Sequence, residues 1–223
     1  MAYILLILAV LLSYAAVRVL KPDKEYGLRL LLAFSGAFLL ALTVFELLPD
    51  VYRSTDPKTV GIFILLGILL QIFLEFYSQG LEHGHKPHRS EKLRQRVLIF
   101  SSLCIHAFLE GIPIQTYEPI VVGIIIHKIP VAIVLSTLLV NSKTKNIYAL
   151  GIILIFSVMT PLGSFLAHNY TFLQTIQAPL MALVIGVFLH ISTVILFESS
   201  KGHQFNIRKL IVIILGIFLA FLL

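Results

Sequence analysis

The chain has 223 residues, of which 58% are hydrophobic and 13% are charged, and its mean hydropathy is +0.98. This composition excludes an ordinary soluble domain and indicates an integral membrane protein. The formal net charge is +6, and the single cysteine, Cys104, excludes a disulfide framework or a thiolate metal cluster within one chain.

The apolar segments predict an all-α, polytopic membrane protein with eight transmembrane helices. Each segment is long enough, or nearly so, to cross about 30 Å of hydrocarbon as a helix, and the segments do not alternate as barrel strands would. We expect a single transmembrane domain over residues 1–223, with a His-bearing, basic cytoplasmic loop at 80–96. The expected helices are roughly 2–17, 28–49, 60–79, 97–116, 119–140, 147–167, 178–197 and 207–223.

The basic residues predict the orientation of these helices. Fourteen of the 17 Lys and Arg residues lie in the links after the first, third, fifth and seventh segments. Because cytoplasmic links are rich in Lys and Arg, both termini are expected to be extracytoplasmic. The first segment has no basic residue before its apolar core, so we interpret it as a helix rather than a signal peptide. The predicted location is the plasma (inner) membrane.

The stretch HAFLEGI, residues 106–112, places ionisable side chains inside the fourth segment. His106 and Glu110 are four residues apart and therefore share one helix face. His127, in the adjacent antiparallel fifth segment, is expected at a similar depth, where Pro130 loosens the helix. Ionisable groups at membrane depth usually mark a functional site. Two imidazoles and a carboxylate suit Zn²⁺ or another first-row divalent ion.

The paired stretches HAFLEG and HKIPVA resemble the HNxxEG and HExPEG motifs of the ZIP (ZRT/IRT-like) metal transporters. ELLPD in the second segment and TPLGSF in the sixth are also similar to sequences of that family. The resemblance covers essentially the whole chain. It implies that His106, Glu110 and His127 are the ligands of the main transport site.

Four positions depart from the family pattern. Ala107, Lys128 and Val131 stand where many members have ligands for a second, adjoining metal, and Thr160 precedes the proline where some members add a Glu. An ammonium repels a divalent cation, so we expect a single-metal site in which Lys128 replaces the second metal. A degenerate, inactive member is the alternative.

Further polar residues are candidates for the metal pathway, each with an ordinary structural alternative. Glu46 and Asp50 could form an acidic entrance or a polar helix end. Glu75 and Glu198 could form an exit or be helix-end carboxylates. A His-bearing tract between the third and fourth segments could bind metal weakly or be a solvated link; it contains His83, His85 and His88. His190, at membrane depth, is interpreted as a structural hydrogen-bonding residue rather than a pathway residue.

These features together predict a carrier that moves a divalent transition metal, most simply Zn²⁺, into the cytoplasm; Fe²⁺, Mn²⁺ and Cd²⁺ are not distinguished. The metal is substrate, not cofactor. The expected partners are this ion and the lipid bilayer, with a homodimer left open and no nucleic acid. An intramembrane zinc hydrolase is an alternative, although HExxH is absent because residue 107 is Ala. A second alternative is a sensor or scaffold protein that binds the metal without transporting it.

The resemblance also implies movement of the site-bearing helices against the rest. Small residues permit close helix contacts and are expected to provide the sliding surfaces. They are Gly36, Gly61, Gly67, Gly163 and Gly186.

Overall fold

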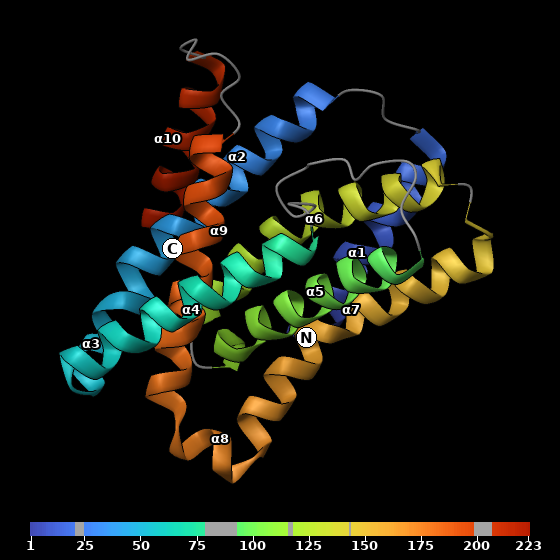
Figure 1. Ribbon diagram of the computed structural model, residues 1–223. Coiled ribbons are helices and arrows are strands. Elements are labelled where there is room, and N and C mark those ends of the chain that lie inside the picture. The colour runs from blue at the N-terminus through green and yellow to red at the C-terminus, as the bar shows by residue number, and fades with distance from the viewer. Residues whose placement is uncertain (21–24, 79–92, 116–117, 143, 199–206) are drawn as a thin grey trace.

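The computed structural model describes residues 1–20, 25–78, 93–115, 118–142, 144–198 and 207–223, except the side chains of 25–26, 93–94, 118 and 198. Every regular element in these ranges is helical, so the predicted all-α class is confirmed (Figure 1). The elements are α1 (Ala2–Leu20), α2 (Glu25–Leu42), η1 (Thr43–Leu47), α3 (Leu48–Ser54), α4 (Pro57–Ser78), α5 (Leu93–Gly111), η3 (Ile112–Gln115), α6 (Glu118–Asn141), α7 (Asn146–Asn169), α8 (Thr171–Thr175), α9 (Gln177–Glu198) and α10 (Ile207–Phe221).

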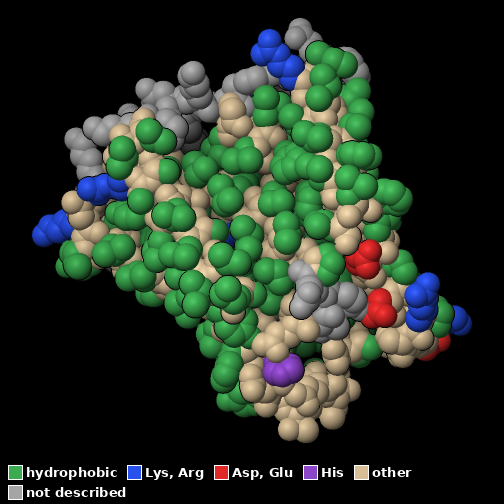
Figure 2. Space-filling view, turned by 180° about the vertical axis from the view of Figure 1, so that it is seen from behind, with side chains coloured by type: hydrophobic (Ala, Val, Ile, Leu, Met, Phe, Trp, Pro, Cys, Tyr) green, Lys and Arg blue, Asp and Glu red, His purple; other side chains and the backbone are tan. Residues whose placement is uncertain are grey.

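The chain is a multi-pass integral membrane protein. Seven helical segments among the described residues are long and apolar enough to cross a bilayer. In its described part α10 has 15 residues, which is shorter than the roughly 20 residues that a span needs. The count of eight spans therefore stays a prediction. Figure 2 shows that hydrophobic side chains cover most of one face of the molecule.

The second membrane segment continues past the position where the sequence suggested its end. Helix α2 runs directly into the π-helical turn η1 and then into α3, which ends at Ser54 rather than near residue 49. Pro49 lies in the first turn of α3, directly after the π-helical turn. Single π-helical turns inside α-helices are frequent near functional sites. This turn contains Glu46.

The long helices pack as two groups (Figure 1). The first group, called the site group, consists of α1, α5, α6 and α7; α1 contacts α6 and α7, and α5 contacts α7. The second, called the support group, consists of α2, α4, α9 and α10; α4 packs on α9, and α2 packs on α9 and α10. The two groups meet where α2 contacts α6 and where α4 contacts α5.

The closest glycine contacts lie inside these groups rather than between them. A Cβ atom on Gly163 would lie 1.9 Å from the backbone oxygen of Phe108, which joins α7 to α5. A Cβ on Gly67 would lie 2.0 Å from the oxygen of Leu183, which joins α4 to α9. Gly61 has no neighbour within 4 Å. Gly163 and Gly67 thus lie at contacts within a group, and Gly61 lies at no close contact, so the predicted role of these residues as sliding surfaces stays a prediction.

Both described ends of the chain lie at one face of the bundle. The Tyr3 hydroxyl accepts a hydrogen bond from Gln115, which follows the end of α5. The ring of Phe221 packs edge-on against Phe45 in η1, with centroids 5.8 Å apart. We call this face, which also carries α3 and α8, the α8 face. The sequence predicts that it is extracytoplasmic.

Candidate metal centre

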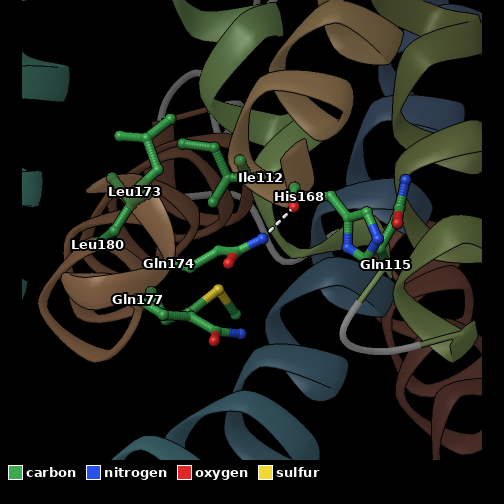
Figure 3. Close-up of a pocket in the computed structure, with 9 residues that line it drawn as sticks. Ile112, Gln115, His168, Leu173, Gln174, Gln177 and Leu180 are labelled. Carbon is green, nitrogen blue, oxygen red and sulfur yellow. Dashed lines mark hydrogen bonds between the residues drawn. The ribbon is translucent and has the colours of Figure 1, made fainter. Parts of the chain in front are cut away.

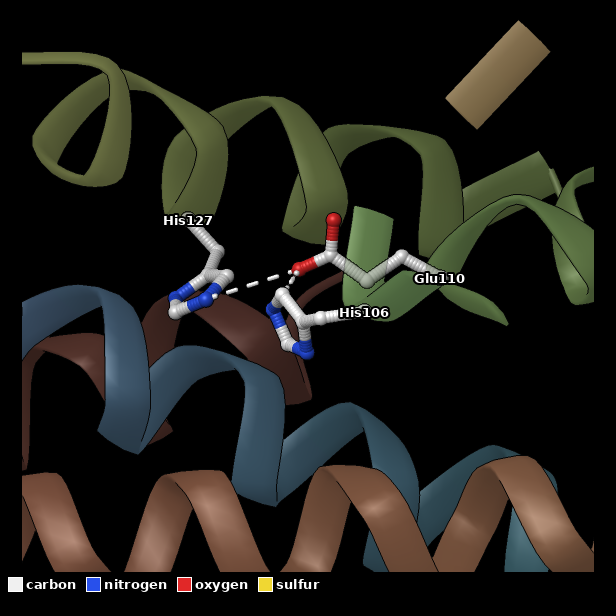
Figure 4. Close-up of side chains that lie close together, drawn as sticks. All are labelled: His106, Glu110 and His127. Carbon is white, nitrogen blue, oxygen red and sulfur yellow. Dashed lines mark ion pairs between the residues drawn. The ribbon is translucent and has the colours of Figure 1, made fainter. Parts of the chain in front are cut away.

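Two neighbouring helices bring three potential ligands together (Figure 4). His106 and Glu110 lie one turn apart on α5, and His127 lies on α6. Oε1 of Glu110 is 2.9 Å from Nε2 of His106 and 3.5 Å from Nε2 of His127. In the part of the chain that the structure describes, this is the only group of three or more His, Cys, Asp or Glu side chains close enough to share one ion.

The three side chains are buried, since His106 and Glu110 are 1% exposed and His127 is 0% exposed. Their ligand atoms all lie within 4.8 Å of one another. In a tetrahedral zinc site with bonds of about 2.0 to 2.2 Å, neighbouring ligand atoms are about 3.3 Å apart. The two distances from Glu110, 2.9 and 3.5 Å, lie on either side of that value, so a zinc ion fits this group after side-chain rotations.

Lys128 completes the cluster from the next position on α6. Its Nζ atom lies 2.5 Å from Oε2 of Glu110, and the lysine side chain is 1% exposed. The same atom lies 4.8 Å from the centre of the Phe156 ring on α7, close enough for a cation–π contact. The two oxygens of Glu110 therefore face different partners: Oε1 faces the imidazoles, and Oε2 faces the ammonium.

Close contact between α5 and α7 sets the position of the ligands. A Cβ on Gly111 would lie 2.0 Å from the backbone oxygen of Thr160, so only glycine allows this approach. The Thr160 hydroxyl donates to the backbone oxygen of Ala107 across 2.8 Å. Beyond Gly111 the chain tightens into η3, which contains Pro113. Two of the positions that depart from the family pattern, Ala107 and Thr160, thus join α5 to α7.

The α8 face carries two neighbouring hollows, which share Gln174, Gln177 and Met181. The first, about 290 Å³ and shown in Figure 3, has His168 and Gln115 in its wall. The second, about 550 Å³, has Asp50 in its wall, whereas Glu46 is not among its lining residues.

The remaining candidates lie apart from the central cluster. His190 on α9 pairs with Glu75 on α4, with Nε2 and Oε2 2.6 Å apart. The side chain of Glu198 lies outside the described part of the chain, as do residues 79–92, which include His83, His85 and His88.

Sequence reasoning missed three of these relationships, namely the ring of Phe156 beside Lys128, the bond from Thr160 to α5, and the pairing of Glu75 with His190. All three depend on the register between helices that are distant in sequence. Gly67 and Gly186 precede Glu75 and His190 on the same helices by eight and four residues, but these positions alone do not specify that the two helices meet.

Comparisons with known proteins point to a family of zinc transporters. The family model described as ZIP Zinc transporter matches residues 82–223. Zinc transporter ZIP1 of Homo sapiens is 25% identical over 278 residues, covering 96% of this chain and 86% of that protein. The Mus musculus protein of the same name is 25% identical over 279 residues, with the same coverage. That of Danio rerio is 29% identical over 137 residues, covering 56% of this chain and 41% of that protein. The chain belongs to the ZIP zinc transporter family.

Proposed function

We propose that this protein carries Zn²⁺ across the plasma membrane into the cytoplasm, with His106, Glu110 and His127 as the ligands of the moving ion. The observation that carries the proposal is the meeting of two imidazoles and one carboxylate, at most 1% exposed, inside a bundle of apolar helices. Its membership of a zinc transporter family supports a carrier over the hydrolase and over the sensor.

The central site holds one ion, because Lys128 takes the place of a second. The Lys128 ammonium contacts Oε2 of Glu110, the oxygen that does not face the imidazoles. A fixed positive charge at this position repels a divalent cation. The same ion pair keeps Glu110 from being a lone charge when no metal is bound. An unpaired carboxylate at this depth would be costly.

The ion enters from the α8 face and leaves on the opposite face. Asp50, exposed beside the larger hollow, attracts cations there, and Glu46 on the preceding turn adds negative charge nearby. Glu75, with Glu198 and the loop histidines His83, His85 and His88, is on the predicted cytoplasmic side. The ion gradient or the membrane potential supplies the driving force, since the sequence contains no nucleotide-binding loop.

Transport requires the site group to move against the support group. The ligands belong to α5 and α6, and the glycine contacts hold α5 to α7 and α4 to α9. Each group can therefore move as a unit, with the boundary at α2–α6 and α4–α5. At this boundary Gly123 of α6 faces Leu42 and Phe38 of α2.

Zinc uptake by proteoliposomes tests the proposal. The wild-type protein should accumulate Zn²⁺, and His106→Ala, Glu110→Ala and His127→Ala should each remove uptake. The matched control is His168→Ala, which changes an exposed histidine on the α8 face. This variant should keep most of the zinc uptake. Uptake at the wild-type level in all three ligand variants would contradict the assignment. Competition by Fe²⁺, Mn²⁺ and Cd²⁺ in the same assay ranks the substrates.

A further inference from the structure

Glu75 and His190 form a second contact between a carboxylate and an imidazole, away from the central cluster. Oε2 of Glu75 lies 2.6 Å from Nε2 of His190, and the two side chains are 23% and 14% exposed. Glu75 belongs to α4 and His190 to α9, so both belong to the support group. The central ligands all belong to the site group.

The position of this pair is fixed by the crossing of α4 and α9. A Cβ on Gly67 would lie 2.0 Å from the oxygen of Leu183, and a Cβ on Gly186 would lie 2.0 Å from the oxygen of Ile64. The two backbones therefore touch at this crossing, which defines the register between the helices. Glu75 lies about two turns beyond this crossing and His190 about one turn beyond it. Their side chains are thus brought together by rigid elements.

Glu75 is three residues from the end of α4, about 4.5 Å along the helix axis. In the predicted orientation this end of α4 faces the cytoplasm. Helix α4 also packs against α5, the helix that carries His106 and Glu110. The pair is therefore placed on the side of the bundle where a transported ion must leave.

We propose that Glu75 and His190 form a second, weaker binding site for the transported divalent transition metal, on the support group, which accepts the ion after it leaves the central site. An imidazole nitrogen and a carboxylate oxygen are ligands that zinc and its neighbours prefer. A zinc ion between the two atoms would need a separation of about 3.3 Å, compared with 2.6 Å now. Rotation of the partly exposed Glu75 side chain provides this opening.

Among the described residues two protein ligands contribute to this site, which makes it weak, and water fills the remaining positions. Weak binding suits an ion that must be released. Both ligands are partly exposed, unlike the central ones, and Glu75 lies close to the end of its helix. The sequence suggested that Glu75 and Glu198 form the exit. In the structure the neighbour of Glu75 is the imidazole nitrogen of His190.

Zinc binding to a purified variant that lacks the central and loop histidines tests this inference. The background is His106→Ala and His127→Ala, with asparagine at the loop positions His83, His85 and His88. Equilibrium dialysis with radioactive Zn²⁺ should find about one weakly bound ion per chain. Adding His190→Ala should weaken it about tenfold or more, since even second-shell changes cost metal sites 10- to 100-fold. His168→Ala should change nothing.

Replacing His190 with cysteine tests whether this residue is a metal ligand or only forms a structural hydrogen bond. In the same background His190→Cys should restore zinc binding and strengthen Cd²⁺ binding, because a thiolate is a soft ligand. A protein that needs only the hydrogen bond would gain nothing from this change. Equal zinc binding with histidine, alanine and cysteine at position 190 would overturn the proposal.

Uptake by the otherwise unaltered chain gives a second test that does not require the multiple variant to fold. Glu75→Gln and His190→Ala should lower the maximal rate of zinc uptake and leave the KM for external Zn²⁺ unchanged; His190→Cys should recover part of the rate. Unchanged rates in both variants would contradict a role in transport. The inference rests on the proposed function, but the dialysis experiment measures this pair even if the central site proves inactive.

Discussion

Nζ of Lys128 lies 2.5 Å from Oε2 of Glu110, and both side chains are 1% exposed. The ammonium therefore occupies the side of the carboxylate that a second cation would need. We expect Lys128→Glu to remove the repulsion and add a ligand, so that the central site holds two ions. Metal analysis of purified protein should find about one more zinc per chain than in the wild type.

Lys128→Ala is the control for this change. It removes the repulsion without supplying a ligand, so the zinc content should stay at the wild-type value. An unchanged zinc content in Lys128→Glu would mean that the lysine does not stand in for a second metal.

The contact between α5 and α7 should be sensitive to a single methyl group. Gly163→Ala would place a Cβ 1.9 Å from the backbone oxygen of Phe108, so the two helices must separate. Overpacking of this kind costs about 1 to 3 kcal/mol, and the ligands on α5 would shift with it. We expect lower thermal stability in detergent and weaker zinc uptake.

Gly151→Ala, on the same helix, is the matched control because nothing lies within 4 Å of its added Cβ. Its stability should equal or slightly exceed that of the wild type, since alanine favours helix. Equal stability of both variants would contradict the close packing of α5 on α7.

Joining the two helix groups should stop transport. In a Cys104→Ser chain, Leu42→Cys and Gly123→Cys place thiols on α2 and α6, where a Cβ on Gly123 would lie 2.7 Å from Leu42 Cδ1. A short thiol cross-linker should join them and block zinc uptake, with recovery after reduction.

The control cross-link stays inside the support group. Gly36→Cys and Ile195→Cys join α2 to α9, where a Cβ on Gly36 would lie 3.2 Å from that of Ile195. This link should leave most uptake intact, because the two helices move together. Full zinc uptake by the protein cross-linked between α2 and α6 would show that the two groups do not move against each other at this boundary.

Orientation rests on the distribution of basic residues, with Arg53 and Lys58 as the only ones in links on the predicted outer side. A tag added at either terminus should therefore bind antibody on intact cells. Protection of both tags until the membrane is permeabilised would reverse the assigned orientation.

Helical class and the central ligand group could be predicted from local patterns. Apolar length indicates a span, and the spacing of His106 and Glu110 places them on one helix face whatever surrounds them. The short link to the next segment then returns the chain as an antiparallel helix, which carries His127 to a similar depth. Glu75 and His190 are 115 residues apart, so their meeting depends on the backbone contact of Gly67 and Gly186. No local pattern specifies that register.

The extension of the second segment to Ser54 was missed for a different reason. A proline after an apolar run usually signals a helix end. Here a π-helical turn directly precedes Pro49, and the chain continues as a helix to Ser54.

Anomalous diffraction at the zinc edge from zinc-loaded crystals of the wild-type protein tests the central claim most directly. The account predicts one strong central peak bounded by Nε2 of His106, Oε1 of Glu110 and Nε2 of His127, at about 2.0 to 2.2 Å from each. Lys128 Nζ should remain beside Glu110 Oε2. Transport-competent protein whose crystals show no zinc between these three residues would contradict the account.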